Sequence, residues 1–447
     1  MNLRIGIILL MSCWNFLHLS AERVNMAVAG ANTKGMVLNT ELINSTISRL
    51  SKAGGGTLFF PSGTYLTGSI HLKSNITLDL EAGAILRFSD NFDDYLPYVE
   101  TRYEGVMLKS FQPLIYAVDA ENITIKGEGT LDGQGKKWWD ECFKVSKVMK
   151  ETNGDRSKMN KYQLLYETTN DMKMLAAETN EDWHNTLNQR FFRPPFIQPI
   201  RCKRVCIEGV KIVNSPFWTV NPEFCDNVLV DGVTIINVPS PNTDGIDPES
   251  CSNVRINNCH ISVGDDCVAI KSGRDFQGRK LNVPCENITI TNCTMLSGHG
   301  LSIGSEMSGS VRKVVISNCT FEGTDRGIRI KSTRGRGGVV EDVCVNNVVM
   351  KNISGEVILL SLAYSKMPEE PKSERTPVFH SFYFSGIVAD QVQRPIVIDG
   401  LKESPITDVV LNNIFIRNSQ EKSSFRNCKN VVLRDVSVNG KEIPFVE

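Results

Sequence analysis

Four short polar phrases hold the residue types in this sequence that are best suited to acid–base chemistry. They are Asn242-Thr243-Asp244, Gly264-Asp265-Asp266, Gly298-His299-Gly300 and Arg329-Ile330-Lys331. The three carboxyl groups can give and take protons, and like charges held close together raise the proton affinity of one member. The arginine and the lysine can hold an anionic group, the arginine through a two-pronged contact. The set predicts a site that moves protons next to a bound anion.

The spacing of these phrases indicates that they come together in the fold. Asp244 and Asp265 are 21 residues apart, Asp266 and His299 are 33 apart, and His299 and Arg329 are 30 apart. Each interval is about one coil of a solenoid, and neighbouring coils stack about 4.8 Å apart. We expect the aspartates to lie side by side, with His299 and then the two cations further along the same stripe.

A group of paired carboxyls is what hydrolysis of a glycosidic bond requires. One acid gives a proton to the leaving oxygen, and a carboxylate activates water or attacks the sugar. Flanking cations would hold the carboxylate of an acidic sugar. Each phrase alone has a simpler explanation, because aspartates and basic runs are common in turns and on solvated surfaces. The joint spacing is what favours a catalytic site.

A repeated strand-like phrase would position these residues. Within it aliphatic residues alternate with polar ones, and it ends in Asn, Asp or Gly, which tolerate a left-handed corner. Copies begin at residues 204, 227, 253, 287, 313 and 342, in steps of 23, 26, 34, 26 and 29 residues. The phrases lack helical periodicity and the hairpin signals of an antiparallel sandwich. We therefore predict an all-β, right-handed parallel β-helix.

Two segments depart from the repeat. Residues 40–53 have an amphipathic pattern, which predicts a short N-terminal helix that caps the open end of the solenoid. Residues 141–190 contain no strand phrase and predict a helical or irregular insertion on one face. Residues 22–447 are otherwise predicted to form a single catalytic domain.

The first 21 residues have the pattern of a cleaved signal peptide. Arg4 precedes a short apolar run, and small residues follow up to Ala21. This predicts a secreted or periplasmic protein, with a lipoprotein acylated at Cys13 as the alternative. No other segment predicts a membrane span.

Composition excludes several functions. The formal net charge is -1, so no attraction to nucleic acid or membrane is expected. Several of the 13 cysteines close strand phrases, which favours buried free thiols with one or two bridges. Cys202 and Cys206 lack partners for a zinc site. We expect no metal and no cofactor, and we expect a monomer.

The four phrases, in this order and spacing, resemble the signature motifs of glycoside hydrolase family 28, the polygalacturonases. Residues 292–305 resemble that family's active-site histidine pattern throughout. The resemblance extends from about residue 32 to the C-terminus and is weakest in the insertion. It implies a β-helical enzyme that hydrolyses α-galacturonosyl linkages, with a pectic polysaccharide or oligogalacturonide as its partner.

The resemblance also implies a role for each residue. Asp265 would be the general acid, and Asp244 with Asp266 would bind and activate water. This arrangement gives inversion and implies carboxyl groups about 6.5–9.5 Å apart. His299 would tune or orient the acid. Substrate contacts would come from Arg329, Lys331 and Asn242.

Other activities remain open. The insertion is long enough to close one end of a groove, which predicts exo-action from a chain end. A rhamnogalacturonan or xylogalacturonan hydrolase of the same family is the first alternative. A pectate lyase would need calcium-binding acids and an arginine base, and the histidine phrase does not fit it. A β-helical protein that only binds carbohydrate is the last alternative.

Overall fold

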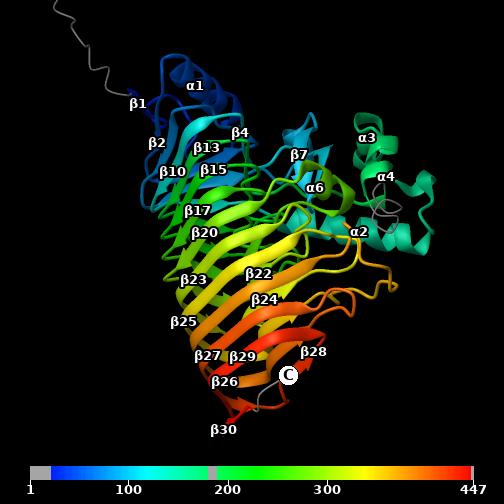
Figure 1. The fold of residues 1–447 in the computed structure, drawn as a ribbon. Helices are drawn as coiled ribbons and strands as arrows, with labels where there is room; N and C mark the ends of the chain where they lie inside the picture. Colours follow the sequence, from blue (N-terminus) through cyan, green and yellow to red (C-terminus); the bar gives the residue numbers. More distant parts are fainter. Residues whose placement is uncertain (1–21, 180–188, 444–447) are drawn as a thin grey trace, which may run out of the picture.

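The chain winds into a right-handed parallel β-helix, seen in the computed structural model of Figure 1, and this confirms the predicted fold class. The structure describes residues 22–179 and 189–443. The predicted signal peptide and Cys13 lie outside the described residues. Within them, no helix is long and apolar enough to cross a membrane.

Three parallel ladders run along the solenoid, and successive coils stack in them. The first ladder contains β1 (Glu22–Asn25), β2 (Gly56–Phe60), β5 (Ile76–Leu80), β10 (Glu121–Gly127), β13 (Lys203–Glu208), β15 (Asp226–Asp231), β17 (Ser252–Asn257), β20 (Cys285–Thr291), β23 (Val311–Glu322), β25 (Val339–Ser361), β26 (Val378–Asp399), β27 (Ile406–Ser419) and β29 (Cys428–Val438). The second contains β3 (Gly63–Thr67), β6 (Ala84–Phe88), β11 (Thr130–Asp132), β14 (Lys211–Val213), β16 (Thr234–Ile236), β18 (His260–Ser262) and β21 (Thr294–Ser297).

The third ladder carries the predicted chemistry. It contains β4 (Ile70–His71), β9 (Ile115–Val118), β12 (Ile197–Ile200), β19 (Val268–Ile270), β22 (Leu301–Ile303), β24 (Ile328–Lys331) and β28 (Ser424–Arg426). Between β12 and β19 it continues through single bridges at Val220 and Ile246. The long strands β23, β25, β26 and β27 bend at the corners and serve more than one ladder. β30 (Lys441–Glu442) pairs antiparallel with β29 at the C-terminal end.

The core forms because equivalent aliphatic positions of successive coils stack. Val228 pairs with Val254, and Val254 pairs with Ile288, and all three are buried. The corners use asparagines in the left-handed conformation, with φ of 57° at Asn253 and 58° at Asn287. Asparagine adopts the left-handed conformation more readily than most residues, so the repeated Asn favours a turn at these corners.

Helices cover one end and one flank of the solenoid. α1 (Thr40–Lys52) buries Ile43, Ile47 and Leu50 against the first coils, as the predicted cap requires. Figure 1 places four helices and β7 on one flank. They are α2 (Lys136–Glu151), α3 (Lys161–Thr169), α4 (Met172–Glu178) and α6 (Asp275–Leu281), with short turns at η1 (Phe92–Tyr95) and η2 (Arg156–Lys158). β7 (Val99–Tyr103) and β8 (Val106–Ser110) form an antiparallel hairpin there.

All cysteines of the described residues are free thiols, and most are buried. The one or two bridges that the sequence left open are therefore not formed among them. Several thiols stack along the coils, as the backbone N–H of Cys225 against the Sγ of Cys251 at 3.3 Å shows.

Candidate active site

The four polar phrases occupy one phase of the third ladder. Val268 of β19 pairs with Leu301 of β22, and Leu301 pairs with Ile328 of β24. Asp265 and Asp266 lie in the turn before β19, and His299 lies in the turn before β22. The backbone N–H of Gly245 bonds to the carbonyl of Asp266 at 2.9 Å, which sets Asp244 one coil away. The structure thus brings together every residue that the sequence singled out.

The three aspartates form a compact group. One carboxylate oxygen from each of Asp244, Asp265 and Asp266 lies within 4.8 Å of the others. This proximity follows from the coils, because residues at one phase of adjacent coils are separated by one inter-strand spacing, about 4.8 Å. The predicted separation of about 6.5–9.5 Å is between whole carboxyl groups, and it stays a prediction.

Asp266 is the member of the group that contacts both cations. Its side chain is buried and accepts hydrogen bonds from Ser302 Oγ at 2.7 Å, from the Arg329 guanidinium, and from Lys331 Nζ at 2.9 Å. Although burial opposes ionisation, Lys331 and Arg329 hold the pKa of Asp266 well below its usual range. Arg329 and Lys331, two of the predicted substrate contacts, are only 8% and 5% exposed, and both form ion pairs with Asp266.

The pKa of Asp244 is shifted in the opposite direction, upward. Burial, reinforced by the charge of Asp265, raises its pKa well above the usual value, while the ammonium of Lys271 opposes that rise. Lys271 Nζ lies 3.6 Å from Asp244 Oδ2 and 4.3 Å from the ring centroid of Trp218. Asp244 Oδ1 has no hydrogen-bond partner among the described residues. Because this oxygen is buried as well as unpaired, it is the kind of acceptor that an internal water satisfies.

Asp265 is the most accessible of the three, with 23% of its side chain exposed. Its Oδ1 accepts the backbone N–H of Asp266 at 3.0 Å, and His299 Nε2 lies 3.5 Å from the same oxygen. His299 Nδ1 is 2.7 Å from Asp325 Oδ2, and this contact raises the pKa of the imidazole. His299 therefore lies between Asp265 and Asp325, and the contact with Asp325 favours its protonated form.

Asn242 connects Asp265 to the flank of the solenoid. Its Nδ2 donates to Asp265 Oδ2 at 3.3 Å, and its Oδ1 accepts from Arg193 at 2.9 Å. Arg193 is 3% exposed and also donates to the carbonyls of Pro216 and Pro241. The predicted sugar contact is thus held in place by a buried guanidinium.

The sequence analysis missed several residues of this site. They are Lys271, Ser302, Asp325, Arg193 and Tyr364, whose ring centroid lies 5.3 Å from Lys331 Nζ. Two of these residues could have been predicted from the coil period, because Lys271 follows Asp244 by about one coil and Asp325 follows His299 by about one coil. Nothing in the local sequence marks Arg193 or Tyr364, which reach the site from irregular segments.

The groove floor is covered on the N-terminal side of the aspartates. Residues that alternate with inward-facing Val220 and Ile246 point outward on this ladder. Their side chains are nevertheless fully buried, as are those of the neighbouring coils: Gln198, Asn221, Glu223, Asp247 and Glu249. The cover is the β7–β8 hairpin, whose Arg102 carbonyl accepts from Gln198 at 3.0 Å.

A buried arginine fastens that hairpin to the floor. Arg102 Nη1 is 3.2 Å from Glu223 Oε2, and its Nε is 3.4 Å from Glu249 Oε1, with no exposure of any of the three side chains. The hairpin therefore covers this side of the aspartates, while helix α2 of the 141–190 insertion lines a cavity beside Asn242.

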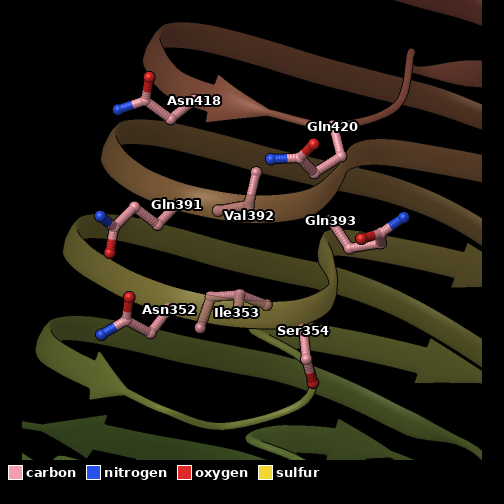
Figure 2. A pocket seen from close by; sticks show the side chains of 8 residues that line it. All are labelled: Asn352, Ile353, Ser354, Gln391, Val392, Gln393, Asn418 and Gln420. Atoms are coloured by element: carbon pink, nitrogen blue, oxygen red, sulfur yellow. The ribbon is translucent and has the colours of Figure 1, made fainter.

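One hollow of the surface lies beside the aspartates, and a larger one lies away from them. A cavity of about 460 Å³ reaches Asn242 and lies between the coils, the hairpin and α2. A larger hollow of about 650 Å³ lies at a corner of the C-terminal coils, where Figure 2 shows rows of amide side chains around buried Ile353 and Val392. None of Asp244, Asp265 and Asp266 lines the larger hollow, so the volume of a hollow does not identify the candidate site.

Comparisons with known proteins agree with this geometry. The sequence model of the family "Glycosyl hydrolases family 28" matches residues 178–438. A hyperthermoactive exopolygalacturonase from Thermotoga maritima is 34% identical, covers 93% of this chain and 92% of its own, and superposes with a TM-score of 0.79. A probable polygalacturonase of Vitis vinifera is 29% identical over 89% of this chain and 74% of its own. An endo-polygalacturonase of Pectobacterium parmentieri is 30% identical over 79% of this chain and 77% of its own.

Proposed function

This chain belongs to the glycosyl hydrolases of family 28, and from that membership we propose that it hydrolyses α-galacturonosyl linkages of pectin from a chain end. The observation that carries the proposal is the group of Asp244, Asp265 and Asp266 beside Arg329 and Lys331. Three carboxyls next to two cations suit a substrate that is both a glycoside and a carboxylate.

Asp265 is assigned as the general acid. It is the member of the group that faces the groove, and His299 and Asn242 hold its carboxyl from two sides. Asp244 and Asp266 are assigned to the hydrolytic water. A water hydrogen-bonded to two oxygens lies about 2.8 Å from each, so oxygens within 4.8 Å can share one water. A raised pKa makes Asp244 a stronger base than an ordinary aspartate, and Lys271 favours its ionised form.

The stereochemical course is proposed as inversion, on the resemblance and on the shared water. The alternative is retention, for which the two carboxyl groups would be about 5–5.5 Å apart. Proton NMR of the first product decides between them. The β-anomer of galacturonate supports inversion of an α-linkage, and the α-anomer overturns it.

Exo-action is supported by the closed end of the groove. The hairpin covers Gln198, Asn221 and Glu223, which would otherwise continue the floor under a longer chain. Relatives of both kinds are known by name, an exopolygalacturonase and an endo-polygalacturonase. Early release of monomer from polygalacturonate is the expected product profile, and a ladder of mid-length oligomers would contradict it.

The activity itself is tested with purified protein on polygalacturonate, by release of reducing ends. Asp265→Asn should lower the rate by about 10²–10⁴-fold, the usual contribution of a general acid. Asp231→Asn is the matched control, because this aspartate sits at a distant corner where it accepts from Asn258 at 2.8 Å. A chelator-sensitive unsaturated product would instead identify a lyase, and wild-type silence on every galacturonate polymer would refute the proposal.

We also propose that residues 1–21 direct export and are removed, and that the mature protein is a monomer. A mature chain that begins at Glu22 by mass spectrometry supports the cleavage site, and a lipid adduct on Cys13 contradicts it.

A further inference from the structure

The cavity of about 460 Å³ beside Asn242 is built partly from the segment that interrupts the coils. One wall is a single face of helix α2, since residues 142, 146, 149 and 150 are spaced so that they share a side. The β7–β8 hairpin contributes Tyr103 and Glu104, and Asn242 closes the side toward Asp265. The cavity therefore opens next to the proposed general acid.

Charge distinguishes one lysine of this helix from the others. Four lysines of α2 have carboxylate partners, at 2.7 Å for Lys136–Asp140, 3.8 Å for Lys137–Asp90, 3.0 Å for Lys144–Glu141 and 3.8 Å for Lys147–Glu151. Lys150 alone lines the cavity, and it forms no ion pair with any residue in the ranges 22–179 and 189–443. Its charge is available to an anion that enters there.

Arg193, a buried cation that also lines the cavity, is likewise without a carboxylate partner in the described part of the chain, whereas Lys150 is exposed. Arg193 donates to two carbonyl groups and to the amide oxygen of Asn242, all neutral acceptors. By contrast, Arg329 and Lys331 on the other side of the aspartates both serve Asp266. The cavity also holds an ion pair, Arg190 with Glu104 at 3.1 Å, so Lys150 and Arg193 leave its lining with an excess of positive charge.

We propose that this cavity binds the terminal uronate residue of the chain that is cut, and that Lys150 holds the carboxylate of that sugar. The proposal rests on the proposed function, because the cavity adjoins the acid that would cleave the next linkage. It makes α2 a specificity element, so a terminal sugar with a free carboxylate binds better than one whose carboxylate is a methyl ester.

The test compares Lys150→Met with Lys147→Met, a control on the same helix. The substrates are trigalacturonate and the same trimer with a methyl ester on the terminal residue alone. A charge-assisted contact made equally in the ground and transition states changes KM and not kcat. Lys150→Met should raise KM for the free acid about tenfold, leave kcat within about twofold, and remove the preference over the ester. Lys147→Met should match the wild type.

Two outcomes separate the failure of this inference from failure of the proposed function. Equal KM values for the two lysine variants in an active enzyme overturn the role of Lys150, as does a loss that appears only in kcat. A wild type that cuts neither trimer refutes the proposed function instead. Titration calorimetry with galacturonate then still tests the cavity, because binding that Lys150→Met does not weaken counts against it.

Discussion

Replacing Arg102 by methionine should both destabilise the protein and change its products. The guanidinium makes ion pairs of 3.2 Å and 3.4 Å with Glu223 and Glu249, and all three side chains are fully buried. Removing one partner of a buried ion pair leaves uncompensated charge and costs about 3–5 kcal/mol. We expect the free energy of unfolding to fall by that amount in denaturant titrations.

The matched control is Arg204→Met. Arg204 is 2.6 Å from Glu121, but half of each side chain is exposed to solvent. Exposed pairs contribute about 0–1 kcal/mol, so this variant should lie close to the wild type. A comparison of the two variants removes the general effect of losing an arginine and leaves the effect of burial.

The loss at Arg102 should depend on pH. Burial and the neighbouring Glu249 raise the pKa of Glu223 well above its usual 4.5. The folded form therefore keeps a proton that the unfolded form releases, so stability falls as pH rises from about 4.5 toward the folded pKa. Without Arg102 the proton affinity of Glu223 rises further, and we expect a larger penalty at pH 8 than at pH 5.

The functional readout is the length of the products from polygalacturonate. If Arg102 fastens the hairpin over the groove, its loss should add oligomers to a product mixture dominated by monomer. The reasoning is refuted if Arg102→Met costs no more stability than Arg204→Met. It is also refuted if a destabilised but folded variant still releases monomer alone.

Two further substitutions test the centre of the site. Asp325→Asn should lower the pKa of His299, since the contact with Asp325 is the main cause of its rise; NMR titration of the imidazole measures this, and an unchanged midpoint contradicts it. The stability that this pair adds is present below pH 6.5 and is lost as pH rises through the folded pKa. Gly298→Ala should reduce both stability and activity, because a Cβ there would lie 2.2 Å from the carbonyl oxygen of Asp265 at φ +100°; wild-type thermal unfolding and turnover would contradict this.

The sequence by itself determined the coils and the membership of the central group. Alternating aliphatic residues and corner asparagines predict the strands and their period, and the period places Asp244, Asp265, Asp266 and His299 at one phase. This works because a solenoid repeats its geometry, so a difference in residue number converts directly into a position along one stripe. Stacked Val228, Val254 and Ile288 show the same rule in the core.

Only the tertiary structure decided how close the carboxyls lie and which charges meet. Phase places Asp244 and Asp266 on neighbouring coils, but it does not specify which of their oxygens approach one another. The sequence does not specify which carboxylate Lys271 and Arg329 contact. The structure places Lys271 beside Asp244 and Arg329 beside Asp266. The hairpin with Arg102 and helix α2 with Lys150 lie outside the repeat, so no period predicts what they cover. These irregular segments cover the coils through contacts with residues that are distant in the sequence, and their own sequences do not predict those contacts.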